Sequence, residues 1–259
     1  QEDNIIAGTA NSLADVNEFL GYDFTPYLPK LWDDDAPQSI RDDYERALEH
    51  RFEQTYDAQL YTWCDAHNIM LTGHPAEPDA SRHLRYFHIP GQDIVWRFIE
   101  PDSSSALEGR QSTQAKATSS MMLHSNRRRN ANEFCGAYGH ELTFEEMRWL
   151  ANWLFIRGCN LLIPHAFYYS IRGTRYHERP PDVGLHSHWW DERFTGFARA
   201  SRRLSWLNTD SKHICHVAIL GEHHHLPYRA AKDCFQNQID FNYLDIEDLT
   251  RCTITDDYK

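Results

Sequence analysis

Apolar residues between positions 40 and 165 follow two alternating periods. Residues 42–64 carry large apolar side chains every three or four positions, with charged residues on the other faces, which predicts an amphipathic helix. We expect one face of this helix to be a buried aromatic stripe, formed by Tyr44, Leu48, Phe52, Tyr56, Leu60 and Trp63. Residues 69–72 then predict a short strand that ends at Gly73.

The alternation of strand and helix continues along the chain. Apolar runs predict further strands near residues 94–98, 129–133 and 160–164, and residues 112–127 are compatible with a helix. Helix and strand thus alternate about four times, which favours βαβ units around a parallel sheet. We expect the four strands to be adjacent, parallel and in chain order.

The start of one helix can be identified from its cap. Thr143 followed by Glu146 forms a capping box, in which each side chain accepts a hydrogen bond from the backbone of the other residue. Apolar residues recur at helical spacing after this pair, and Gly158 is the expected end of the helix.

The pattern restarts after about residue 205. Residues 216–220 and 241–244 predict strands, and residues 227–238 between them predict a helix. We interpret this segment as the opening βαβ unit of a second domain. The expected division is therefore a catalytic region at 1–205 and a truncated second α/β domain at 206–259.

Composition excludes several classes of protein. The formal charge of −12 argues against a nucleic-acid binder, and the one basic run, Arg127 to Arg129, is short and is expected to be a solvated helix end. No apolar run reaches the roughly 18 residues that span a bilayer, so we expect no membrane association. Six scattered cysteines without a CxxC pair favour a reducing compartment, and hence the cytoplasm, although a removed signal peptide stays open.

Candidate chemistry gathers where the predicted strands end, which is where active sites lie in parallel α/β barrels. Carboxylates and histidines beside aromatic rings are typical of carbohydrate sites, where rings stack on sugars and carboxylates act as acid, base or nucleophile. Glu133 and Glu77 are the candidate catalytic residues. The candidate substrate-binding residues are His74, Trp96, Tyr138, His140, His165, Tyr168, Tyr169, Arg172, His186, Trp189 and Trp190.

Each of these residues also has a structural interpretation. Glu133 is either a catalytic group or a solvated strand end, and His165 is either a substrate ligand or a buried imidazole. The loop 170–190 is a candidate pocket wall, but its two tryptophans could equally belong to the core. Glu222 to His225 does not predict a metal site, because adjacent histidines on a strand cannot all face one ion. Phosphate-loop, GxSxG and HExxH motifs are absent from the sequence.

Four stretches together resemble the catalytic region of the α-L-rhamnosidases of glycoside hydrolase family 106. They are GYDFTPYLPKLW, LTGHPAEP, NEFCGAYGHELTFEEMRWLANWLFIRGCNLLIPHAFYYSIRG and RPPDVGLHSHWW. The resemblance implies the second half of a (β/α)8 TIM barrel, followed by the start of a flavodoxin-like or amidotransferase-like domain. It also implies that Glu133 ends the seventh barrel strand and that His165 closes the eighth.

One motif of these relatives is missing. The Asp-Glu-Pro motif that they carry at the end of the fourth strand is not recognisable, and Glu2–Asp3 is its only candidate remnant. Four βα units do not close an eight-stranded barrel, so the chain is either a fragment or pairs with a second copy.

The expected function is that of a bacterial glycosidase that cleaves plant or microbial polysaccharide with paired carboxylates. The alternative is a non-catalytic, carbohydrate-binding or inactive fragment of such an enzyme. We expect a carbohydrate partner and no cofactor, with calcium implied only by the resemblance.

Overall fold

The computed structural model describes residues 9–222 and 225–253, so the Glu2–Asp3 remnant and His223–His224 lie outside the described residues. The chain forms two compact units, Gln1–Ile69 and Met70–Lys259, which are described separately. Among the described residues, no helix is long and apolar enough to cross a membrane.

The first unit is helical. It contains α1 (Ser12–Leu20), a 3-10 helix (Thr25–Trp32), α2 (Gln38–Phe52), a π-helical turn (Glu53–Asp57) and α3 (Ala58–Ala66). Its core is formed by Val16, Phe24, Ile40, Tyr44 and Ala47. The helix predicted at 42–64 is therefore present as α2 and α3, joined by the π turn.

The aromatic stripe of that helix is only partly buried, which corrects the prediction of a continuous core face. Tyr44 is in the core, whereas Phe52, Tyr56, Leu60 and Trp63 are between 37% and 55% exposed. A π turn holds more residues than an α turn, so Tyr56, Leu60 and Trp63 are no longer aligned with Tyr44. Phe52 is the last residue of α2 and is exposed before this turn begins.

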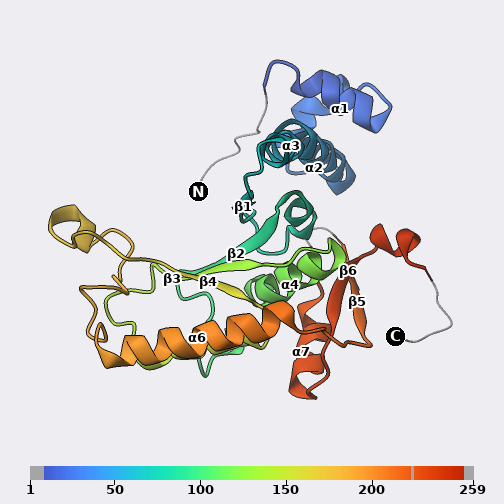
Figure 1. Ribbon diagram of the computed structural model, residues 1–259. Coiled ribbons are helices and arrows are strands. Elements are labelled where there is room, and N and C mark those ends of the chain that lie inside the picture. The colour runs from blue at the N-terminus through green and yellow to red at the C-terminus, as the bar shows by residue number, and fades with distance from the viewer. Residues whose placement is uncertain (1–8, 223–224, 254–259) are drawn as a thin grey trace. The chain divides into compact units, whose positions relative to one another are not determined.

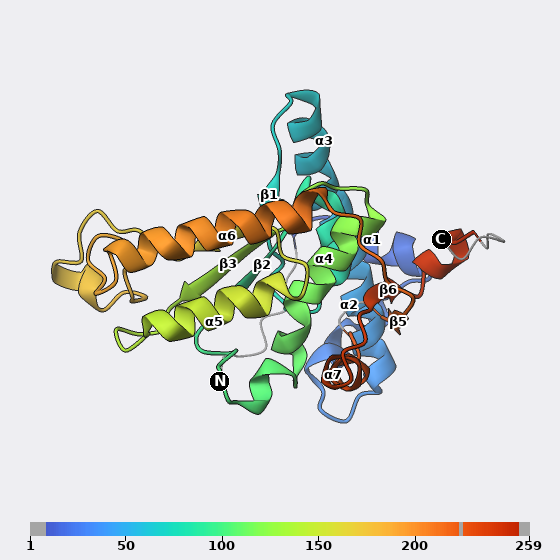
Figure 2. The ribbon, with the colours of Figure 1, turned by 60° about the horizontal axis from the view of Figure 1, so that its bottom comes forward.

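The second unit is built on a parallel four-stranded sheet (Figures 1 and 2). Its strands are β1 (Thr72–Gly73), β2 (Ile89–Val95), β3 (Ala131–Gly136) and β4 (Leu161–Pro164), in the order β1-β2-β3-β4. This order and direction confirm the prediction. The bounds differ: β1 shares only Thr72 with the predicted range, and β2 begins before its predicted range and ends at Val95. β3 continues three residues past Glu133, which therefore does not end its strand.

The sequence predicts helices between these strands, and only some of the connections contain an α-helix. α4 (Gln114–His124) and α5 (Phe144–Phe155) join the last three strands, and α6 (Glu192–Asp210) follows β4. Between β1 and β2 the chain forms a 3-10 helix, Ser81–Tyr86, in place of an α-helix. Among the described residues, β1 and β4 pair with no further strand, so the half-barrel stays a prediction.

One face of the sheet is packed and the other carries polar side chains. Ile94 of β2 and Phe134 of β3 belong to a core that includes Leu150 and Leu154 of α5, with Phe197 of α6 packed against it. Side chains alternate between the two faces of a strand. The residues that precede Ile94 and Phe134, Asp93 and Glu133, therefore lie on the opposite face.

The start of α5 is held by the predicted capping box and by Arg97. Thr143 accepts a hydrogen bond from the Glu146 backbone, and the Glu146 side chain accepts one from the Thr143 backbone. Arg97 Nη1 lies 3.0 Å from Glu146 Oε1, and Arg97 Nε donates to the Tyr138 carbonyl at 2.8 Å. The end of β2 is thereby tied to the loop that follows β3.

Residues after 205 form the predicted βαβ unit. β5 (Ala218–Gly221), α7 (Tyr228–Gln236) and β6 (Asn242–Asp245) make a two-stranded parallel sheet. This sheet packs on α4, where Ser120 Oγ accepts a hydrogen bond from the Tyr243 N–H at 3.0 Å. The segment lies within the compact unit Met70–Lys259, and the domain boundary near residue 205 stays a prediction.

Helix α6 was not predicted from the sequence, because charged residues interrupt its apolar period. Its start does carry a recognisable signal, since the side chain of Asp191 accepts a hydrogen bond from the Arg193 backbone N–H. Phe194, Phe197 and Leu204 pack against the core.

An ion pair between a buried lysine and a half-exposed aspartate attaches the C-terminal βαβ unit to α4. Lys116 Nζ lies 2.6 Å from Asp240 Oδ1, and their side chains are 3% and 46% exposed. Asp240→Asn leaves the buried ammonium without a counter-charge, so it should lower the free energy of unfolding by about 2 kcal/mol, less than for a fully buried pair. Lys116→Met leaves only a half-exposed carboxylate without its partner, so it should lower the free energy of unfolding less. Urea unfolding of both variants checks this order, and equal or reversed losses would contradict it.

Candidate functional site

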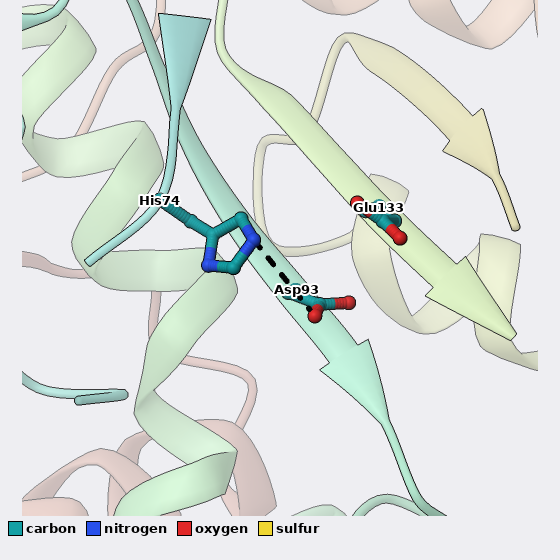
Figure 3. A group of neighbouring side chains, drawn as sticks. All are labelled: His74, Asp93 and Glu133. Atoms are coloured by element: carbon teal, nitrogen blue, oxygen red, sulfur yellow. Dashed lines mark ion pairs between the residues drawn. The ribbon is translucent and has the colours of Figure 1, made fainter. Parts of the chain in front are cut away.

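Three side chains from neighbouring strands meet on the polar face of the sheet (Figure 3). His74 directly follows β1, Asp93 lies in β2 and Glu133 lies in β3. Asp93 and Glu133 are paired in register, so their side chains project side by side. One ligand atom from each of the three residues lies within 4.8 Å of the others, and His74 Nε2 is 3.9 Å from Asp93 Oδ2.

The environment of Asp93 disfavours its charged form. Its Oδ1 atom is buried and has no hydrogen-bond partner among the described residues. Burial, and next the negative charge of Glu133, raise the pKa of Asp93 from 3.8 to about 6, while His74 and Arg179 oppose this rise. The pair therefore retains a proton on Asp93 at mildly acidic pH, where a free aspartate would be ionised.

This arrangement can exchange protons with a bound molecule. A protonated Asp93 can donate a hydrogen bond, and a neighbouring carboxylate can accept a proton from a sugar hydroxyl or a water. Perturbed carboxyls at the exposed face of a sheet are typical of functional sites.

The structure brings Glu133 and His74 together, as the sequence suggested, but it places Glu77 elsewhere. Glu77 is exposed and pairs with Arg110 at 3.0 Å, and Arg110 also forms two hydrogen bonds through Nε with Asp79. Nothing in its contacts connects Glu77 with the carboxyl pair.

Two predicted substrate ligands belong to the core, which corrects those assignments. Tyr138 is 1% exposed, and its hydroxyl donates to the Ile99 carbonyl at 2.6 Å. Trp189 is 4% exposed and packs near Phe144 of α5. Both side chains are buried, and the guanidinium group of Arg97 lies over the ring of Tyr138, so neither ring can stack on a sugar in this structure.

The remaining predicted ligands lie around the ends of β2, β3 and β4. Trp96 is 56% exposed directly after β2. His165 and Tyr168 contact each other edge to face, and His140 stacks on Tyr176. Tyr169, Arg172, His186 and Trp190 are exposed on the loop between β4 and α6. Their substrate-binding roles stay predictions.

Sequence analysis missed three residues of this region: Asp93, Arg179 and Asp182. Asp93 is a single carboxylate in an apolar run, and this feature of the sequence could have identified it as a candidate. Asp182 is 5% exposed and accepts hydrogen bonds from the backbone N–H groups of Tyr168 and His186, at 2.8 and 2.6 Å. It thereby folds the loop after β4 back on itself.

The site does not fit the calcium ion that the resemblance implies. Calcium takes six to eight oxygen ligands, as a rule from carboxylates and carbonyls. Here two carboxylates are accompanied by an imidazole, which is not a usual calcium ligand. We therefore interpret Asp93 and Glu133 as a carboxyl pair and derive no step through calcium.

Comparisons with known proteins show similarity in structure alone. No protein-family model matches the chain, and no curated protein matches it in sequence. The structure of a rhamnosidase from Novosphingobium sp. PP1Y is similar, with a TM-score of 0.64 and 14% sequence identity. The match covers 96% of this chain and 25% of that chain, so this chain spans about a quarter of the rhamnosidase. The chain therefore has an α/β fold that is similar to part of a rhamnosidase, with a parallel sheet and helices.

Proposed function

We propose that residues 70–253 form part of the active site of a glycoside hydrolase of the α-L-rhamnosidase type, with Glu133 as general base or nucleophile. The observation that carries this proposal is the pairing of Asp93 with Glu133 on the polar face of a parallel sheet. The similarity to a rhamnosidase supports the choice of substrate, and membership of glycoside hydrolase family 106 is part of the proposal.

Glu133 is the better candidate for the reacting carboxylate. Asp93 carries the buried, unpartnered oxygen and a pKa raised to about 6, so its charged form is disfavoured and Glu133 is the group left to accept a proton or attack. A protonated Asp93 removes a like charge from beside Glu133. It also offers a donor to a sugar hydroxyl on the same side of the ring.

The general acid of this proposal is a different carboxyl group. Glycosidases place their two carboxyls on opposite sides of the scissile bond, about 5–5.5 Å apart in retaining enzymes and about 6.5–9.5 Å apart in inverting ones. Asp93 and Glu133 project side by side from the same face of the sheet, with ligand atoms within 4.8 Å of one another, so they contact one side of a bound sugar. The chain spans a quarter of the similar rhamnosidase, and we propose that the acid belongs to a part of such an enzyme beyond these residues.

Glu133→Gln tests the central assignment. The substitution is nearly isosteric, so the fold and the affinity for L-rhamnose should be kept. Hydrolysis of an aryl α-L-rhamnoside should fall by about 10² to 10⁴-fold, the usual contribution of a positioned acid or base. Turnover and sugar binding, measured on the same preparations by absorbance and NMR titration, check both expectations.

The matched control is Glu141→Gln, a carboxylate of the loop after β3 that is 71% exposed and lies 3.5 Å from Arg97. It should change neither turnover nor binding. If both variants keep full turnover, Glu133 is structural and the catalytic assignment is wrong. If the wild-type chain binds the sugar without turnover, the non-catalytic alternative is supported.

The raised pKa of Asp93 also predicts a pH-dependent cost in stability. Its folded pKa of about 6 exceeds the unfolded value of about 3.9, so the charged carboxylate disfavours folding above pH 6. Asp93→Asn should therefore raise the free energy of unfolding by about 2 kcal/mol near pH 7.5, for a side chain that is only 20% exposed. This gain should shrink as the pH falls through 6 and vanish near pH 4.

Urea unfolding between pH 4 and pH 8 measures this gain. Glu133→Gln should produce a part of this gain in the free energy of unfolding, because it removes the negative charge that helps to raise the pKa of Asp93. In the double variant, the gains of the two single variants should not add. A gain that is independent of pH would contradict the account.

A further inference from the structure

His74 directs a ring nitrogen with a free lone pair at the carboxyl pair. Its Nδ1 atom lies 3.3 Å from the Pro75 carbonyl oxygen, and because a carbonyl oxygen only accepts, Nδ1 is the nitrogen that carries the hydrogen. The Nε2 atom of the neutral imidazole therefore presents a lone pair, and Figure 3 shows the ring pointing towards Asp93. Histidines that bind a metal are held in the same way, with the second nitrogen donating to a carbonyl or a carboxylate.

The close approach of β1 to β2 brings His74 within reach of Asp93. Gly73, the last residue of β1, pairs with Pro90, and a Cβ atom on the next residue, Gly91, would clash with the Gly73 carbonyl oxygen. Gly91 stands two residues before Asp93, on the same face of β2. Because Gly91 has no side chain, β2 places no side chain between the end of β1 and Asp93.

Three acceptor atoms thus converge on one point of the sheet. His74 Nε2 lies 3.9 Å from Asp93 Oδ2, which is too long for a hydrogen bond. Asp93 Oδ1 is buried and has no hydrogen-bond partner among the described residues. When both carboxyls are ionised, their charges and the imidazole lone pair repel one another, so the cluster favours a bound cation.

We propose that His74, Asp93 and Glu133 bind a divalent transition-metal ion of the zinc class. Zinc lies about 2.0–2.2 Å from imidazole nitrogens and carboxylate oxygens, so two ligands of one ion can stand up to about 4.2 Å apart. The 3.9 Å between His74 Nε2 and Asp93 Oδ2 is within this limit. The other separations are at most 4.8 Å, so a small rotation of the exposed His74 or the half-buried Glu133 side chain completes the site.

The donor set decides which cation the site prefers. An imidazole nitrogen suits zinc, cobalt and their neighbours in the first transition series, whereas calcium and magnesium prefer oxygen ligands alone. The site therefore departs from the calcium that the resemblance implies. Three protein ligands on the polar face of the sheet leave at least one coordination position for water or another small ligand, an arrangement typical of open zinc sites.

A bound ion also gives the site a means of regulation. Glu133 uses the same oxygen lone pairs to bind the ion and to accept a proton, so an occupied site should be inactive in hydrolysis. This consequence rests on the proposed function, whereas binding of the ion does not.

Calorimetric titration of the untagged, EDTA-treated chain with Zn²⁺ and with Ca²⁺ tests the binding. We expect one Zn²⁺ site, with calcium at least about 100-fold weaker. His74→Ala and Asp93→Asn should each weaken Zn²⁺ binding by more than about 100-fold, since loss of a ligand costs more than the 10- to 100-fold of an outer partner. In the wild type, Zn²⁺ should shift the ¹⁵N resonance of His74 Nε2, a readout that needs no variant.

The matched control is His225→Ala, which removes an exposed histidine of the run Glu222–His225 and should leave Zn²⁺ binding unchanged. Thermal unfolding confirms that each variant is folded. Absence of a Zn²⁺ site, an equal affinity for calcium, full binding by His74→Ala or loss of binding in His225→Ala would each overturn this inference.

Turnover of an aryl α-L-rhamnoside, measured for each variant with and without Zn²⁺, separates this inference from the proposed function. Zn²⁺ should inhibit the wild type and His225→Ala, and EDTA should reverse the inhibition, whereas the turnover of His74→Ala should not respond to Zn²⁺. Zn²⁺ binding by a chain without turnover in any condition would overturn the proposed function and leave the metal site in place. Full turnover with Zn²⁺ bound at His74 would overturn the regulation.

Discussion

The in-register pairing of β2 with β3 is the constraint on which the candidate site depends. It fixes Asp93 beside Glu133 on one face and Ile94 beside Phe134 on the other. The apolar pair is held in the core by α5 and α6, so the carboxyl pair cannot separate without disrupting that packing. A one-residue slip of either strand would exchange the faces and bury a carboxylate in the core.

The surrounding structure holds this pair in place from both ends of the strands. Arg97 ties the end of β2 to the capped start of α5 through Glu146. Beyond β4, Asp182 is buried and shapes the loop from which Arg179 acts on Asp93. The buried carboxylate of Asp93 lowers the free energy of unfolding, and hydrogen bonds and packing elsewhere in the fold offset this cost. Such a local cost is common at functional sites.

Local signals in the sequence predicted local structure well. The capping box at Thr143, the strand order and the C-terminal βαβ unit follow from hydrogen-bonding residues and apolar periods within short windows. Glu133 was found because it stands at the predicted end of a strand, before Gly136 and Gly139. Its partner Asp93 was not, because strands separated by α4 acquire their register only through tertiary packing.

Burial was the property that the sequence could not assign. Tyr138 and Trp189 resemble pocket aromatics in sequence, yet core packing covers both rings. The opposite error occurred at Trp63, where a π turn moved a predicted core residue to the surface. The sequence thus predicts which helices and strands form. Whether an aromatic side chain lies in the core or at the site depends on how those elements pack.

The most direct measurement is a ¹³C NMR titration of the Asp93 carboxyl group between pH 3 and pH 9. The account predicts a titration midpoint near 6, since burial and Glu133 both disfavour the charged form. It also predicts a lower midpoint in Glu133→Gln and a displaced midpoint when L-rhamnose is bound. A midpoint near 4 that responds to neither change would show that the two carboxyls act independently, and would contradict the proposed site.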